Sequence, residues 1–182
     1  MRVRTYLSIL LALLLSLALA GCGGGSNSSG AAGSGNATAT PAAPAVVDLP
    51  VAMDLGVQEV QLTAGDTMKY NGNRFTVRTG QPVRIILQNL GQTSREIMAH
   101  DVVVLMPGAD VLGFDIAAGA AKDHDYRPPD LMNEVVASTP LAGPGQTVEA
   151  DFTAPAPGAY PFLCSFPGHY AAGMKGTMVV TP

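Results

Sequence analysis

The most constraining stretch of this 182-residue chain lies near its C-terminus, where Cys164, His169 and Met174 follow one another at intervals of five residues. A thiolate, an imidazole and a thioether form a soft ligand set, and two His with one Cys and a distant Met is the arrangement of electron-transfer copper sites. The second imidazole can come from His100, which lies just ahead of the apolar run 102–106. We therefore predict that His100, Cys164, His169 and Met174 bind one copper ion.

The first 21 residues have the organisation of an export signal. Arg2 and Arg4 precede an apolar segment over 6–20. That segment is shorter than the roughly 20 residues that a membrane-spanning helix needs. It ends in Leu-Ala-Gly-Cys, which resembles the lipobox of bacterial lipoproteins. We therefore expect 1–21 to be a lipoprotein signal peptide and Cys22 to carry a lipid that anchors the mature protein to the outer face of the cell membrane, on the periplasmic side.

Cysteine usage and charge narrow the function further. Lipidation of Cys22 would leave Cys164 without a disulfide partner, because the chain has two cysteines. A free thiol is uncommon in an oxidising compartment, so metal coordination explains Cys164 best. The 10 basic residues less Arg2 and Arg4 leave 8 against 14 acidic residues, a net charge of −6 for the mature chain. This charge argues against nucleic acid as a partner and favours docking to a basic protein.

Residues 22–55 form a segment rich in Gly, Ser, Ala, Thr and Pro. Such a composition cannot build a core, so we expect a flexible tether with a root-mean-square reach of roughly 30 Å. The tether would hold a folded domain, residues 56–182, away from the membrane while leaving it free to turn.

From Gly56 onward, short strand-like runs alternate with turn residues. The runs are 58–63, 75–78, 83–88, 102–105, 135–138, 147–152, 160–163 and 177–180. Many short strands with frequent turns predict an all-β antiparallel sandwich. Residues 109–122 have apolar positions near helical spacing, and Arg127-Pro128-Pro129 would stop a helix, so we expect a small helical flap there.

Three motifs carry a resemblance to a known family. Met98-x-His100-Asp101, Cys164-Ser-Phe-Pro-Gly-His169 and Met174-Lys-Gly-Thr resemble the motifs of azurin-type cupredoxins, and the similarity extends over about residues 58–181. The interval from His169 to Met174 is one residue longer than in azurin and is similar to that of auracyanin, the azurin-like carrier of some photosynthetic bacteria. The resemblance implies an eight-stranded Greek-key β-sandwich, one type 1 copper ion and one-electron transport.

The resemblance also implies roles for residues around the ligands. Met174 would be a weak axial ligand, with the carbonyl of Ala99 opposite it. The backbone N–H groups of Asp101 and Phe166 would point at the sulfur of Cys164. Asp101 stands where azurin has Asn.

Docking and partners are implied in the same way. The edge of His169 would be the electron port, ringed by the apolar residues Met98, Phe166 and Ala171. An apolar collar of this kind suits small, transient redox interfaces. The implied donor is a quinol-oxidising membrane complex, the implied acceptor is a cytochrome or reaction centre, and the carrier itself would be a monomer.

Other readings of the same residues stay open. Zinc could occupy these ligands without redox chemistry. Cys164 and His169 could form a nucleophile–base pair, but no oxyanion-hole motif or third orienting group is evident. Copper enzymes need further His-rich sites, and the chain has three histidines, of which we expect His124 to lie on a solvated face. We therefore expect a carrier that is not an enzyme, with a copper chaperone or storage module as the alternative.

Overall fold

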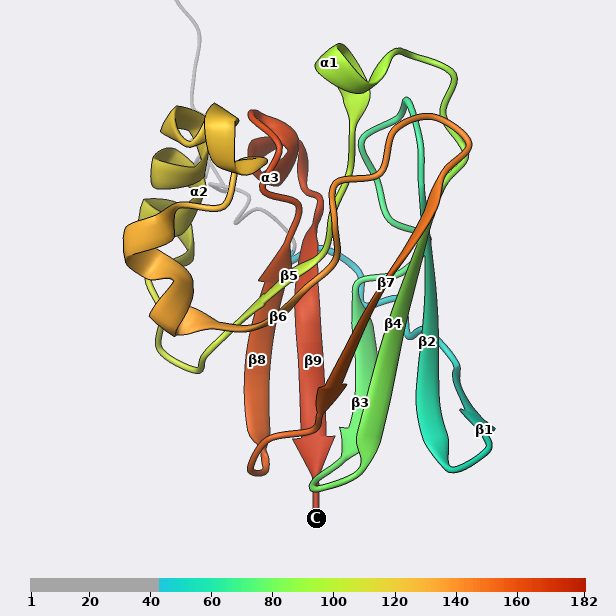
Figure 1. The fold of residues 1–182 in the computed structure, drawn as a ribbon. Helices are drawn as coiled ribbons and strands as arrows, with labels where there is room; N and C mark the ends of the chain where they lie inside the picture. Colours follow the sequence, from blue (N-terminus) through green and yellow to red (C-terminus); the bar gives the residue numbers. More distant parts are fainter. Residues whose placement is uncertain (1–42) are drawn as a thin grey trace, which may run out of the picture. The chain divides into compact units, whose positions relative to one another are not determined.

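The computed structural model describes residues 43–182 (Figure 1). The predicted signal peptide, the predicted lipidation site Cys22 and most of the predicted tether lie outside the described residues. Within 43–182, none of the helices has the length and apolar character needed to cross a membrane.

The described residues form a β-sandwich of two sheets (Figure 1). In spatial order, the first sheet contains β1 (Val51–Asp54), β2 (Val57–Ala64), β4 (Pro82–Asn89) and β7 (Thr147–Thr153). The second contains β3 (Arg74–Arg78), β9 (Lys175–Thr181), β8 (Gly158–Leu163), β5 (Val103–Leu105) and β6 (Val135–Ser138). The chain passes repeatedly from one sheet to the other, so residues distant in sequence meet at both ends of the sandwich.

The predicted Greek-key sandwich is confirmed, with two differences in its strands. All eight predicted runs are strands, but β1 adds a ninth within the described residues. The sandwich is also not wholly antiparallel, because β2 pairs with β4 and β3 pairs with β9 in parallel. Each parallel pair joins strands that a crossover to the other sheet separates, and runs of alternating residues do not reveal such pairing.

Alternation of side chains along the strands builds the main core. In β4, Val83, Ile85 and Leu87 are each at most 1% exposed, while the intervening residues lie nearer to solvent. Phe75 of β3 and Phe162 of β8 meet them from the other sheet, with 5.5 Å between their own ring centroids. This period of two buries one face of each strand against the opposite sheet.

The predicted helical flap is present and covers the outer face of the second sheet (Figure 1). It consists of α2 (Val111–Ala120) and two short 3-10 helices, η1 (Lys122–His124) and η2 (Pro129–Glu134). The helix buries Phe114 and Ala118, whereas Leu112 and Ile116 are 55% and 68% exposed. The double proline does not end the helical flap, because Pro129 is the first residue of η2. The first residue of a helix needs no backbone N–H donor, so proline fits there.

The folded domain begins before the predicted boundary at Gly56. Strand β1 pairs with β2 along its whole length. Upstream of β1, the N–H of Leu49 donates to the carbonyl of Arg74 at 2.7 Å, and Leu49 is 6% exposed. A Cβ atom at Gly72 would lie 2.6 Å from the Leu49 side chain, so the glycine provides the space that this residue fills. The C-terminal part of the predicted tether, from Val47 to Leu55, therefore belongs to the sandwich.

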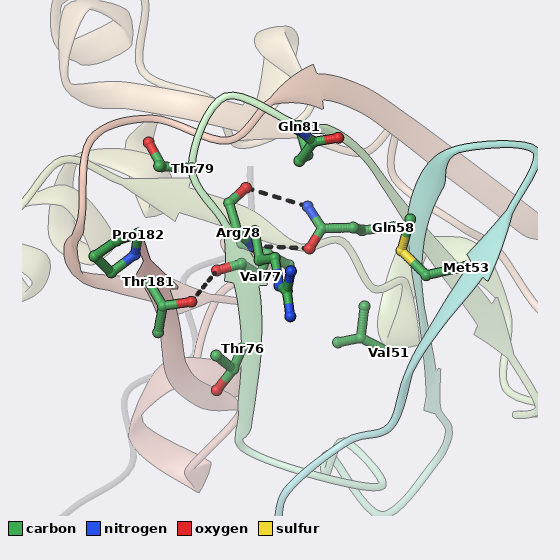
Figure 2. Close-up of a pocket in the computed structure, with 10 residues that line it drawn as sticks. All are labelled: Val51, Met53, Gln58, Thr76, Val77, Arg78, Thr79, Gln81, Thr181 and Pro182. Carbon is green, nitrogen blue, oxygen red and sulfur yellow. Dashed lines mark hydrogen bonds between the residues drawn. The ribbon is translucent and has the colours of Figure 1, made fainter.

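A second link between the sheets lies at the end of the sandwich where the chain terminates. Gln58 of β2 donates to the carbonyl of Arg78 at 3.2 Å and accepts from the Arg78 N–H at 2.7 Å (Figure 2). The pair lines an open groove of about 850 Å³. The other lining residues are Val51, Met53, Thr76, Val77, Thr79, Gln81, Thr181 and Pro182. None of these is a His, a Cys or a carboxylate, so the groove offers no ligand set for a soft metal.

Residues before β1 should contribute measurably to stability. We expect Leu49→Ala to lower the free energy of unfolding by about 2 to 3 kcal/mol, because it removes buried methyl groups and leaves a cavity beside Gly72. Val46, which is 59% exposed, provides the control, and Val46→Ala should change stability by less than about 0.5 kcal/mol. Urea denaturation of both variants measures the difference. Equal stabilities would show that residues 43–50 pack only loosely on the sandwich.

Candidate metal centre

Four predicted ligands converge at the end of the sandwich that carries α1 and α3 (Figure 1). His100 follows the short helix α1 (Arg95–Met98), and its N–H and carbonyl pair with those of Ala142. Cys164 follows β8 directly, and His169 opens α3 (His169–Ala172). Met174 directly precedes β9. Two loops that are distant in sequence therefore supply the site.

Three of these side chains lie close enough to share one metal ion. One ligand atom each from His100, Cys164 and His169 lies within 4.8 Å of the others. The Cys164 Sγ is 3.4 Å from the His169 Nδ1, and the two imidazole ring centroids are 4.9 Å apart. His100 and Cys164 have no exposed surface, and His169 is 2% exposed.

The polar atoms of this cluster fit a bound cation. Both ring nitrogens of His100 are buried without a hydrogen bond of normal geometry. Leaving such groups unpaired is costly, so the site is built for a partner that accepts lone pairs. Burial lowers the pKa of His100, and it lowers the pKa of His169 to about 4. The imidazoles are therefore neutral at pH 7, the form that binds metal.

The electrostatic surroundings of the Cys164 thiol suit a metal ligand. Burial raises the pKa of the thiol well above its usual range, and the nearby Asp101 carboxylate raises it further. The backbone N–H groups of Asp101 and Phe166 face the sulfur and lower this pKa. A thiolate in this position needs a cation beside it, because burial strongly disfavours an isolated charge. Soft Cu or Zn ions supply that charge.

Met174 is fully buried beside the cysteine. Its carbonyl accepts from the N–H of Cys164 at 3.0 Å, and its own N–H donates to the carbonyl of His169 at 2.9 Å. Backbone hydrogen bonds therefore connect Met174 to both Cys164 and His169.

Two glycines make the tight path around His169 possible. Gly168 and Gly173 flank α3 with φ angles of 82° and 99°. These angles lie in the left-handed region that side chains disfavour. The single turn between them places the imidazole beneath the surface and returns the chain to Met174.

Asp101 links the two ligand loops directly. Its carboxylate accepts hydrogen bonds from the backbone N–H of Ser165 at 2.7 Å and from the Ser165 hydroxyl at 2.6 Å. Asp101 has no exposed surface, and burial raises its pKa to about 6 against these hydrogen bonds. The neighbouring Arg127 pulls the pKa in the opposite direction. The Asp101 carboxylate therefore links the two ligand loops, and Ser165 supplies both hydrogen-bond donors.

The sequence motifs gave no sign of Ser165 or of Tyr70, whose hydroxyl donates to the carbonyl of Asp101. These contacts span 64 and 31 positions of the chain, so no local pattern could reveal them. Ala99, predicted to face Met174, is fully buried next to His100.

The predicted docking collar is only partly at the surface. Ala171 is exposed and Met98 is half-buried, but Phe166 is 6% exposed and stacks on His169 with ring centroids 4.8 Å apart. Ile97 of α1, which was not among the predicted collar residues, is 64% exposed beside Met98.

The polar flap residues divide into two groups. Asp123 and His124 are exposed, and for His124 this exposure was predicted. Asp125 instead pairs with Arg95 at 3.2 Å and with Arg127 at 3.5 Å, so it ties the flap to α1.

A β-sandwich that buries two imidazoles and a thiolate at one end, with a methionine beside them, defines the class of copper-binding cupredoxins. Residues 57–181 match the model of a family described as copper binding proteins, the plastocyanin/azurin family. The chain belongs to this family. The site accordingly holds one copper ion.

Relatives within the family are similar over most of the described domain. Auracyanin-A of Chloroflexus aurantiacus is 33% identical over 135 residues, which cover 72% of this chain and 75% of the relative. Azurin of Pseudomonas aeruginosa is 35% identical over 127 residues, covering 66% of this chain and 83% of that protein. The chain is therefore an azurin-type cupredoxin close to the auracyanins.

Solved structures support the same placement. Dithionite-reduced auracyanin of Roseiflexus castenholzii superposes with a TM-score of 0.62 and 35% identity, covering 72% of this chain and all of that chain. Auracyanin A of Chloroflexus aurantiacus, described as a blue copper protein, gives a TM-score of 0.62 at 31% identity. It covers 69% of this chain and 100% of its own.

The buried carboxylate of Asp101 should make the stability of the metal-free protein depend on pH. The folded state holds the Asp101 proton up to about pH 6, whereas an unfolded aspartate releases it near 3.8. Stability from this group is therefore present below pH 4 and is lost as the pH rises through 6. Between pH 4.5 and 7.5, the wild type should lose about 2 kcal/mol relative to Asp101→Asn. Urea denaturation of both proteins at both pH values tests this. The histidines are common to both proteins, so parallel stability curves would contradict the expected shift.

Proposed function

We propose that this protein is a membrane-tethered one-electron carrier in which His100, Cys164 and His169 hold the copper ion and Met174 is a weak axial ligand. The observation that carries the proposal is the cluster of three buried donor side chains, His100, Cys164 and His169. Both ring nitrogens of His100 are buried there without a hydrogen-bond partner. The bound copper supplies the chemistry, which is reversible cycling between Cu(I) and Cu(II).

The chain's own contribution is a rigid, dry setting for the ligands. His100 is held by backbone pairing with Ala142, and Cys164 by the hydrogen bond to Met174. The Asp101–Ser165 link fixes one ligand loop against the other. Ligands held this way have little room to move when the charge changes, which keeps the cost of electron transfer low.

Electron exchange would take place through the edge of His169. Its 2% exposure means that a partner reaches the ring through a narrow opening. Met98, Phe166 and Ala171 would form the apolar collar around it, and the exposed side chain of Ile97 would extend this surface. An apolar, weakly charged contact of this kind favours rapid binding and release.

The N-terminal sequence supports an anchored, exported protein. A signal peptide over 1–21 and a lipidated Cys22 would place the domain at the outer face of the cell membrane. The low-complexity segment after Cys22 would let the monomeric domain move between a quinol-oxidising membrane complex and a cytochrome or reaction centre.

The alternative of a copper chaperone or storage module fits the site less well. Proteins that hand over metal need ligands that an acceptor can reach, whereas all four residues proposed here are at most 2% exposed. An enzyme is also disfavoured, because the same burial leaves no room for a substrate beside Cys164 and His169.

The first test is the visible spectrum of the copper-loaded protein. An intense red-region band should bleach with ascorbate and return with an oxidant while the copper stays bound. Cys164→Ser should abolish this band, since it requires copper bound to thiolate. Transfer of the copper to a metal-free acceptor during cycling would favour delivery, and a strong band that persists in Cys164→Ser would refute the ligand assignment.

The axial role of Met174 predicts a change in reduction potential. Met174→Gln should keep the copper but lower the potential by roughly 60 mV or more, equivalent to a tenfold change in a one-electron couple. The reason is that an amide oxygen is harder than a thioether and favours Cu(II). Met132→Gln, at a position that is 40% exposed on η2, is the matched control. Equal potentials for the two variants, measured by voltammetry, would exclude an axial Met174.

A further inference from the structure

Tyr70 is a half-buried residue of the loop between β2 and β3, and the ligand set above does not use it. Its hydroxyl donates a hydrogen bond to the carbonyl of Asp101. Its ring packs on Phe162 with ring centroids 5.8 Å apart, against the core cluster that contains Cys164. Burial of the phenol raises the pKa of Tyr70, and the nearby Cys164 raises it further. The loop therefore brings a neutral hydrogen-bond donor to Asp101, the residue that follows the ligand His100.

The peptide that accepts this hydrogen bond is held from both sides. The carbonyl of Asp101 accepts from the Tyr70 hydroxyl. The N–H of Val102, in the same peptide group, donates to Thr139 Oγ1 at 3.0 Å. The Asp101 carboxylate is bound separately by Ser165. Residue 101 is therefore constrained through its carbonyl, its side chain and the following N–H. The N–H of Asp101 faces the sulfur of Cys164. The direction of this N–H depends on the three constraints on residue 101.

The loop that carries Tyr70 is itself anchored. Asn71 closes it against the end of β2, donating its N–H to the carbonyl of Thr63 at 3.1 Å and accepting the Thr63 N–H at 2.9 Å. Lys69, the residue before Tyr70, donates to the carbonyl of Ala172 in α3. Neighbouring residues of one loop therefore contact both ligand loops, Lys69 the C-terminal one and Tyr70 the one that follows His100.

We propose that Tyr70 is a positioning residue that tunes the copper site: its hydroxyl holds the Asp101 peptide so that the Asp101 N–H stays directed at the Cys164 sulfur. Reduction increases the negative charge on the thiolate, so donors nearby favour the reduced form and raise the reduction potential. The proposal rests on the proposed function, because the tuning needs copper bound to Cys164.

The test compares two Tyr→Phe variants. Tyr70→Phe removes the hydroxyl and keeps the ring on Phe162. Tyr160→Phe is the matched control, because Tyr160 is 4% exposed and its hydroxyl likewise donates to a backbone carbonyl, that of Ala156, at 2.8 Å. At the midpoint potential of the wild type, Tyr70→Phe should raise the ratio of oxidised to reduced protein about threefold to tenfold, where tenfold corresponds to 59 mV. The visible band should move to longer wavelength. Tyr160→Phe should change neither.

A second readout does not depend on copper. In the metal-free or zinc-loaded protein, the amide proton resonance of Asp101 should shift in Tyr70→Phe and stay in place in Tyr160→Phe. Incorporation of 3-fluorotyrosine at position 70 strengthens the donor and retains the ring, so it should raise the potential. This variant decides the question if Tyr70→Phe does not fold.

The outcomes separate the two proposals. Potentials and Asp101 amide resonances that are the same in Tyr70→Phe and Tyr160→Phe would overturn the positioning role, even where both variants lose stability. A wild-type protein without a reversible blue band would instead contradict the proposed function. In that case the Asp101 amide resonance alone would still show whether Tyr70 directs this N–H group.

Discussion

The burial of two imidazoles and a thiol at one end of the sandwich is the constraint on which the rest of the structure depends. Polar groups in a dry interior are costly, and His100 keeps both ring nitrogens unpaired. The sandwich can sustain this arrangement because Cys164 and Met174 belong to the same packed core as Phe75, Phe162 and the aliphatic residues of β4. A bound copper ion then offsets the cost and completes the end of the domain.

Around the ligands, specific hydrogen bonds between loops hold the chain in place. Asp101 joins the loop after His100 to the loop after Cys164 through Ser165. The β2–β3 loop adds Tyr70 on one side and Lys69 on the other. The site therefore receives support from three separate segments. Such support is what an electron carrier needs, because a site that relaxes on every charge change exchanges electrons slowly.

The flap shows how tertiary context selects among faces that look equivalent in sequence. Leu112 and Ile116 are as apolar as Phe114, yet the second sheet presents Val103, Leu105 and Leu163 as the surface to be covered. The larger ring of Phe114, with the small Ala118 one turn later, fills that surface and leaves the two aliphatic residues exposed. Helical spacing alone locates an amphipathic segment, but it does not say which stripe meets the sheet.

Local chemistry was enough to predict the ligand types, their spacing within one loop, the eight main strands and the sandwich, because each depends on residues within a few positions of one another. The ninth strand, the parallel pairs, the Asp101–Ser165 link and the contact of Tyr70 were decided only by the tertiary structure. Each joins segments that are distant in sequence, and such pairing depends on how the two sheets stack. The chain thus determined which side chains can bind a metal, and the fold determined how firmly they are held.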